Sequence, residues 1–253
     1  MMEQSQTLFI RRLDKALLAA FEWVADVHRE RGVPDIASAW GDMLASSLND
    51  ARITDMPLVD DRQTLFPFVT EHRLNVTCFE VLRSGLGGGP TIDLLFQLWF
   101  DTEDVQVAWG VPLIFRRIPE NGRLTDMEWL DLRDDCKHIC KATGSGRIAF
   151  MADDRYFDWY NRHGEIAHQS ILVMDAATMA GTRSPPIPIF GRSCETFCLD
   201  LASGWIGDPS LSGRAPDSLL DDLLQTCHVR QILRIHVTEV HPSERFAPQK
   251  LPI

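Results

Sequence analysis

Two stretches near the N-terminus carry apolar residues at helical spacing. Over residues 8–31 the apolar side chains recur every three or four positions, and charged side chains occupy the opposite side. A similar pattern covers residues 35–49. Gly32 and Pro34 lie between the two stretches, where they are typical of a helix end. The N-terminal region is therefore expected to form a helical hairpin.

After Pro67 the apolar period changes from helical spacing to alternation. The stretch 91–101 carries apolar residues at every second position, namely Ile92, Leu94, Phe96, Leu98 and Phe100. The stretch 105–111 alternates in the same way, and a short polar turn, DTED, separates the two. This pattern predicts an antiparallel hairpin, whose second strand should end or run at a sheet edge at Pro112.

Further strands are indicated on both sides of this hairpin. Residues 72–83 alternate until Cys78, and a phase slip near Phe79 is typical of a bulge. Residues 230–240 alternate between an apolar face and a polar face, and the polar face carries Arg234 and His236. Short apolar runs at 147–151 and 170–174 predict two more strands.

A helix is predicted after residue 124, because Thr125 and Glu128 have the spacing of a capping box. The apolar face of this helix consists of Trp129, Leu132, Cys136, Ile139 and Cys140. Gly144 is a natural stop for it, and a second helix is predicted over 216–227. Cysteines on such an apolar face are expected to pack in the core as small hydrophobic residues.

These elements favour the α+β class, because strands and helices do not alternate regularly. The predicted architecture is a largely antiparallel sheet with an N-terminal helical hairpin and flanking helices. A seam near 118–124 suggests a helical-hairpin and β-hairpin region over 1–120 and an α+β region over 121–253. The two regions are expected to form one compact unit or two tightly packed subdomains.

Composition and charge narrow the range of partners. The hydrophobic fraction of 45% and the charged fraction of 24% are ordinary for a folded soluble protein. The formal net charge of −11 argues against binding to duplex nucleic acid, because such binding needs a basic surface that neutralises phosphates. No apolar run approaches the roughly 20 residues of a membrane-spanning helix, and MMEQSQTLFIRR lacks the pattern of a secretory leader. A soluble, cytoplasmic protein that does not bind membranes is expected.

Tryptophans are the candidates for a contact surface. The core positions of the predicted elements accommodate Trp23, Trp40, Trp99, Trp109 and Trp129. In contrast, Trp159 and Trp205 lie in irregular polar segments, where a large aromatic side chain is available to a partner.

The stretch RHGEIAH places His163, Glu165 and His168 within six positions, and Cys194 and Cys198 follow downstream. The arrangement His-Gly-Glu with a later cysteine pair resembles the zinc-dependent nucleobase deaminases. The resemblance implies that His163, Cys194 and Cys198 hold zinc, while Glu165 moves protons without binding the metal. Ser193 at a helix N-cap would place the two cysteines one turn apart.

The same residues allow two other interpretations. His163 followed by Gly164, with Cys194 in FGRSCET, is similar to the His-Gly and Cys placements of caspase-like peptidases, in which the histidine assists a cysteine nucleophile. In the third interpretation His163, Glu165 and His168 are turn and edge residues, and Cys194 and Cys198 are buried thiols.

The favoured functional hypothesis is a non-catalytic binding or regulatory protein that acts through protein–protein contacts and needs no cofactor. The alternative is a zinc-dependent hydrolase of the nucleobase-deaminase type, and a peptidase-like Cys/His site is the third hypothesis.

Overall fold

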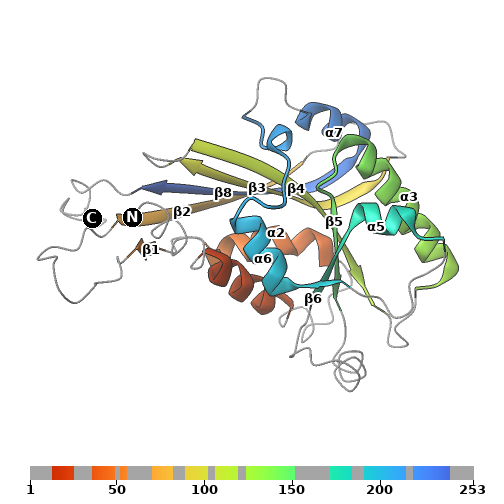
Figure 1. Cartoon of the computed structure of the whole chain (residues 1–253), viewed down its shortest axis with the longest axis horizontal. Helices are drawn as coiled ribbons and strands as arrows, with labels where there is room; N and C mark the ends of the chain where they lie inside the picture. Colours follow the sequence, from red (N-terminus) through yellow and green to blue (C-terminus); the bar gives the residue numbers. More distant parts are fainter. Residues whose placement is uncertain are drawn as a thin grey trace, which may run out of the picture.

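One eight-stranded sheet forms the middle layer of the protein, in the order β1-β2-β8-β3-β4-β5-β6-β7 (Figure 1). The computed structural model describes residues 13–25, 36–48, 52–55, 70–81, 89–101, 106–118, 124–151, 171–183, 191–214 and 219–239. The strands are β1 (Arg52–Asp55), β2 (Thr70–Glu80), β3 (Thr91–Asp101), β4 (Gln106–Arg117), β5 (Arg147–Met151), β6 (Ile171–Asp175), β7 (Arg192–Ser193) and β8 (His228–Glu239). The helices are a helix over 13–25, α2 (Ile36–Leu48), α3 (Asp126–Ala142), α5 (Ala176–Gly181), α6 (Cys194–Ala202), α7 (Leu220–Thr226) and the 3-10 helix η1 (Pro209–Leu211).

The predicted α+β class is confirmed, but the sheet is mixed rather than largely antiparallel. β3 pairs with β4 in antiparallel fashion, as the hairpin pattern predicts. However, β8 inserts between β2 and β3 and runs parallel to β3, and β4 runs parallel to β5. Alternation decides which face a side chain occupies, and it does not decide which strand becomes the neighbour. The sheet therefore joins strands from both 1–120 and 121–253.

One hydrophobic core lies between the sheet and the helices 13–25, α2 and α6, on the lower side in Figure 1. Phe21 and Phe197 meet edge to face with ring centroids 5.9 Å apart, which joins helix 13–25 to α6. Gly41 allows α2 to approach the sheet closely, because a Cβ there would lie 2.5 Å from Gln231 Oε1. The same glycine donates its N–H to Gln231 Oε1 at 3.0 Å. The two predicted N-terminal helices thus pack into one core, and the connection between them lies outside the described residues.

A second core lies on the other face of the sheet, under α3, α5 and α7. The predicted capping box of α3 is confirmed, since Glu128 N donates to Thr125 Oγ1 and Thr125 N donates to Glu128 Oε2. The face predicted to be buried is buried at Trp129, Leu132 and Cys136. None of the described helices has the length and apolar composition that a membrane crossing needs.

Candidate functional site

The predicted zinc and thiol site is described only in its C-terminal half. His163, Glu165, His168 and the tryptophan at 159 lie outside the described residues. Ser193 caps α6 as predicted, because its Oγ accepts the N–H of Thr196 at 3.0 Å. Cys194 and Cys198 lie one turn apart at the start of that helix, with their Sγ atoms 4.0 Å apart.

The environment of these two thiols is apolar. Cys194 is 4% exposed and Cys198 is fully buried in the lower core. Burial raises the pKa of Cys198 well above its ordinary value, and the hydrogen bond with Cys194 raises it further. The described residues contain no group of three or more potential metal ligands. Both side chains are thus packed in the core, and the raised pKa keeps Cys198 in its thiol form at neutral pH.

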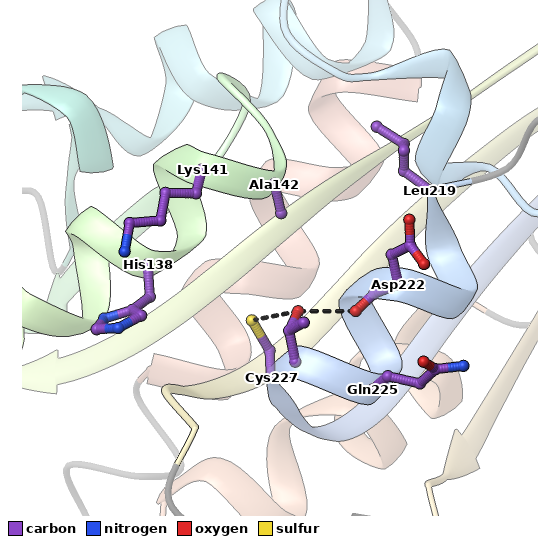
Figure 2. A pocket seen from close by; sticks show the side chains of 8 residues that line it. His138, Lys141, Ala142, Leu219, Asp222, Gln225 and Cys227 are labelled. Atoms are coloured by element: carbon purple, nitrogen blue, oxygen red, sulfur yellow. Dashed lines mark hydrogen bonds between the residues drawn. The ribbon is translucent and has the colours of Figure 1, made fainter.

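A pocket of about 400 Å³ lies between α3 and α7 (Figure 2). On one wall, α3 contributes His138, Lys141 and Ala142. On the other, α7 and its flanking residues contribute Leu219, Asp222, Gln225, Thr226 and Cys227. The lining combines the charged side chains of Lys141 and Asp222 with apolar groups such as Ala142 and Leu219.

The thiol at the base of this pocket is not an activated nucleophile. Burial raises the pKa of Cys227, so its reactive thiolate form is scarce at neutral pH. The neighbouring Thr226 hydroxyl donates to Asp222 O at 2.7 Å, and it lies 3.9 Å from Cys227 Sγ. His138 Nδ1 is engaged with Asp134 O at 2.8 Å. These contacts favour binding over covalent chemistry at this position.

The loop over residues 203–214 provides a third candidate site. It starts at the end of α6 on the lower face, passes the side of β4 and reaches the upper face at η1 (Figure 1). β5 pairs with β4 only over residues 113–117. On the same side of β4, the described residues before 113 form only the isolated bridge between Gly110 and Asp208. The bridge has two hydrogen bonds, of 3.0 and 2.9 Å. The strand does not end at Pro112 as predicted: β4 continues to Arg117 between β3 and β5, and the β5 ladder begins at Leu113, directly after the proline.

Trp109 fixes the first half of the 203–214 loop. Its ring stacks on Phe100 with centroids 5.4 Å apart, and its Nε1 donates to Leu201 O at 3.1 Å. Gly207, at φ +134°, lies so close that a Cβ there would be 2.4 Å from Trp109 Cδ1. Trp205 N donates to Asp200 O at 2.9 Å, which ties the turn to α6. The backbone of the turn is thus held firmly on both sides.

From this fixed turn the side chain of Trp205 projects into solvent, with 85% of its surface exposed. Its exposure agrees with the expectation that it does not belong to the core. Two further apolar side chains in neighbouring elements are also exposed, Leu199 on α6 at 40% and Val107 on β4 at 45%.

The sequence pattern does not predict the pocket residues or the surroundings of Trp99. The pocket needs α3 and α7 side by side, which no local pattern encodes. Trp99 was expected in the core, yet it is half-buried on the opposite face from Leu98 and Phe100. In the alternating stretch 91–101, Trp99 falls between the apolar positions 98 and 100, and this spacing indicates that its side chain points to the other face. Trp23 was also expected in the core and is 46% exposed.

No protein-family model, no curated protein and no solved structure matches the chain. The candidate sites therefore rest on the geometry of this chain alone.

Proposed function

We propose that this protein is a non-catalytic binding protein that engages a protein partner through Trp205. The observation that carries the proposal is the 85% exposure of this tryptophan on a turn fixed by Trp109 and Asp200. Tryptophan is strongly enriched among the few interface residues that supply most of the binding energy. A fully exposed indole contributes little to the stability of the chain that carries it.

The fixed backbone of the turn favours this role. A binding residue on a mobile loop loses conformational freedom when the partner binds, and that loss weakens the affinity. Trp205 avoids most of this cost, because Gly207 packs against Trp109 and Asp208 pairs with Gly110. The exposed side chain of Leu199, next to Asp200 on α6, would extend the apolar contact.

The test compares Trp205→Ala with a matched control, Met127→Ala. Met127 is 69% exposed on α3, so both variants remove a large exposed apolar side chain. Partners retained by the wild-type protein should first be identified, and the affinity for the purified partner should then be measured for all three proteins. We expect Trp205→Ala to weaken binding roughly 30-fold, the factor that corresponds to an interface hot spot. Met127→Ala should bind as the wild type does, and an equal loss in both variants would refute the role of Trp205.

A zinc-dependent hydrolase of the nucleobase-deaminase type is the second candidate function. The observation that favours it is the 4.0 Å separation of Cys194 Sγ and Cys198 Sγ. Two thiolates on one tetrahedral zinc ion lie about 3.8 Å apart, as follows from the usual Zn–S distance. His163 would be the third ligand, and Glu165 would move protons.

Metal content separates the two proposals. If the zinc hypothesis holds, purified protein contains stoichiometric zinc, and Cys194→Ser and His163→Ala lose it while Glu165→Gln keeps it. Cys136→Ser is the matched control, because Cys136 is a buried thiol of the other core. Fully folded protein without metal would exclude the zinc hydrolase and leave the binding function in place.

A further inference from the structure

The face of the sheet that α3 and α7 partly cover, the upper face in Figure 1, carries a row of polar and aromatic side chains on strands β2, β8 and β3. β2 presents Arg73, Asn75, Thr77 and Phe79 on this face, and all four are exposed. The register places Thr77 beside Arg234 and Asn75 beside His236 on β8. The described helices cover the other end of this face, as Figure 1 shows for α3 and α7. We call this row the arginine face.

Arg234 lies at the centre of the arginine face and has no carboxylate partner among the described residues. Its Nε and Nη2 donate to one neutral acceptor, Gln97 Oε1, at 3.1 and 3.0 Å. Its guanidinium carbon lies 3.9 Å from the ring centroid of Trp99 and 5.2 Å from that of Phe79. Nη1 makes no hydrogen bond within the described residues.

A second arginine lies beside the same tryptophan ring. Arg214, at the end of the 203–214 loop, also lies over the Trp99 ring, at 4.2 Å. It forms a two-pronged ion pair with Asp101, which also contacts His236 Nε2 at 2.6 Å. Asp101 is thus committed to Arg214 and His236. Burial lowers the pKa of Arg234, and the charge of Arg214 lowers it further. Both effects disfavour the charged form of the guanidinium, and no carboxylate among the described residues offsets them.

Phe79 adds an apolar group to the arginine face. It is 40% exposed, although the strand pairs with β8 without interruption from His72 to Glu80. The bulge expected at this position is therefore absent. Phe79 instead follows the regular alternation of β2, which puts its aromatic ring on the polar face with Asn75 and Thr77. An exposed ring beside an arginine is the arrangement on which nucleobases stack in single-strand binding surfaces.

We propose that the arginine face binds a nucleotide unit, with the phosphate on Arg234 and Arg73 and the base on Phe79. A guanidinium recognises phosphate oxygens through paired N–H donors. Thr77 lies directly beside Arg234, and Asn75 lies between Thr77 and Arg73 on β2, where both can donate further hydrogen bonds. The unit comes from a free mononucleotide or from a single-stranded nucleic acid. This site lies on a different face from the Trp205 turn and does not depend on the proposed protein partner.

The test measures binding of three probes to the full chain at low salt: inorganic phosphate, adenosine monophosphate and a fluorescent oligothymidylate. Arg234→Gln and Arg73→Gln remove the proposed phosphate contacts, and Phe79→Ala removes the stacking ring. Arg133→Gln is the matched control, because Arg133 also stacks on a tryptophan, 5.1 Å from the ring of Trp129 on α3. Circular dichroism of each variant checks the fold.

We expect each arginine-face variant to weaken nucleotide binding by about tenfold, as the loss of one charge-assisted hydrogen bond predicts. Phe79→Ala should weaken both nucleotide probes and leave phosphate binding unchanged. Tighter binding of the oligothymidylate, with a steep salt dependence, would identify a nucleic-acid strand as the source. Equal binding per nucleotide would identify a free nucleotide. The exposed Arg73 provides the decisive variant should Arg234→Gln fail to fold.

Three results would overturn the proposal. The first is the absence of binding to any phosphate probe, and the second is an equal loss in Arg133→Gln and Arg73→Gln. The third is binding of an acidic peptide such as polyglutamate, dependent on Arg234 and Arg73, without binding of either nucleotide probe. That third result would assign the arginine face to a protein ligand instead.

Discussion

Replacing Trp109 tests whether the 203–214 loop is held in place as the structure indicates. The Trp109 side chain is half-buried, stacks on Phe100 and donates to Leu201 O. Truncating a fully buried tryptophan to alanine costs about 3–5 kcal/mol. Because Trp109 keeps some solvent exposure, we expect Trp109→Ala to lower the free energy of unfolding by about 3 kcal/mol, the lower end of that range.

The measurement is urea unfolding followed by far-ultraviolet circular dichroism, since fluorescence changes with the loss of an indole. Val107→Ala is the matched control, because Val107 lies two residues away on the same strand and is 45% exposed. It should change the free energy of unfolding by less than about 0.5 kcal/mol. Limited proteolysis should also cut the 203–214 loop faster in Trp109→Ala than in the control. A loss below about 1 kcal/mol in Trp109→Ala would refute the proposed packing.

A double-mutant cycle with Gly207→Ala makes the test specific for the contact. The new Cβ would lie 2.4 Å from Trp109 Cδ1, and φ at this position is +134°. Gly207→Ala therefore combines a clash with the indole and backbone strain. In the Trp109→Ala background the clashes with Cδ1 and Cγ disappear, while the Cβ of residue 109 stays 3.0 Å away and the backbone strain remains, so the second substitution should cost less there. Additive costs would show that the ring does not rest on Gly207.

Three further predictions concern other parts of the chain. Thr125→Ala should cost about 0.5–2 kcal/mol in thermal melting, because it removes the N-cap of α3; an unchanged melting temperature would contradict the cap. Hydrogen bonds from Arg214 and then His236 lower the pKa of Asp101 from 3.8 to about 2, so the carboxylate stabilises the fold fully above pH 3.8 and loses this effect as pH falls towards 2. The difference in melting temperature between wild type and Asp101→Asn should shrink over that range, and a constant difference would argue against the ion pair. In native protein Cys198 should resist alkylation far longer than the half-buried Cys140, and equal rates would contradict the burial of Cys198.

Local hydrogen bonding is the part of the fold that the sequence predicts best. The caps at Thr125 and Ser193 follow from groups three residues apart, which meet in any helix that starts there. The β3–β4 hairpin follows from alternation on both sides of a short polar turn. In each case the partners are close in sequence, so little else in the chain can change the outcome.

The sequence does not predict which strands that are distant in the chain become neighbours in the sheet. β8 is the last strand of the described chain, yet it lies between β2 and β3 and makes part of the sheet parallel. Its alternation fits an antiparallel or a parallel neighbour equally well, because both keep side chains on the same two faces. Only this insertion brings Arg234 beside Gln97 and Phe79.

The 203–214 loop links the two proposed binding surfaces and also separates them. Trp205 lies near its start on the α6 side, and Arg214 lies at its end over Trp99. Between the two, Asp208 holds Gly110 by backbone hydrogen bonds and accepts the Thr143 hydroxyl at 2.7 Å. A movement of Trp205 on binding would have to break this anchor before it could shift Arg214. Because the anchor involves both the backbone of β4 and the end of α3, the two surfaces are expected to bind their ligands independently, so Arg73→Gln should leave partner binding at Trp205 intact.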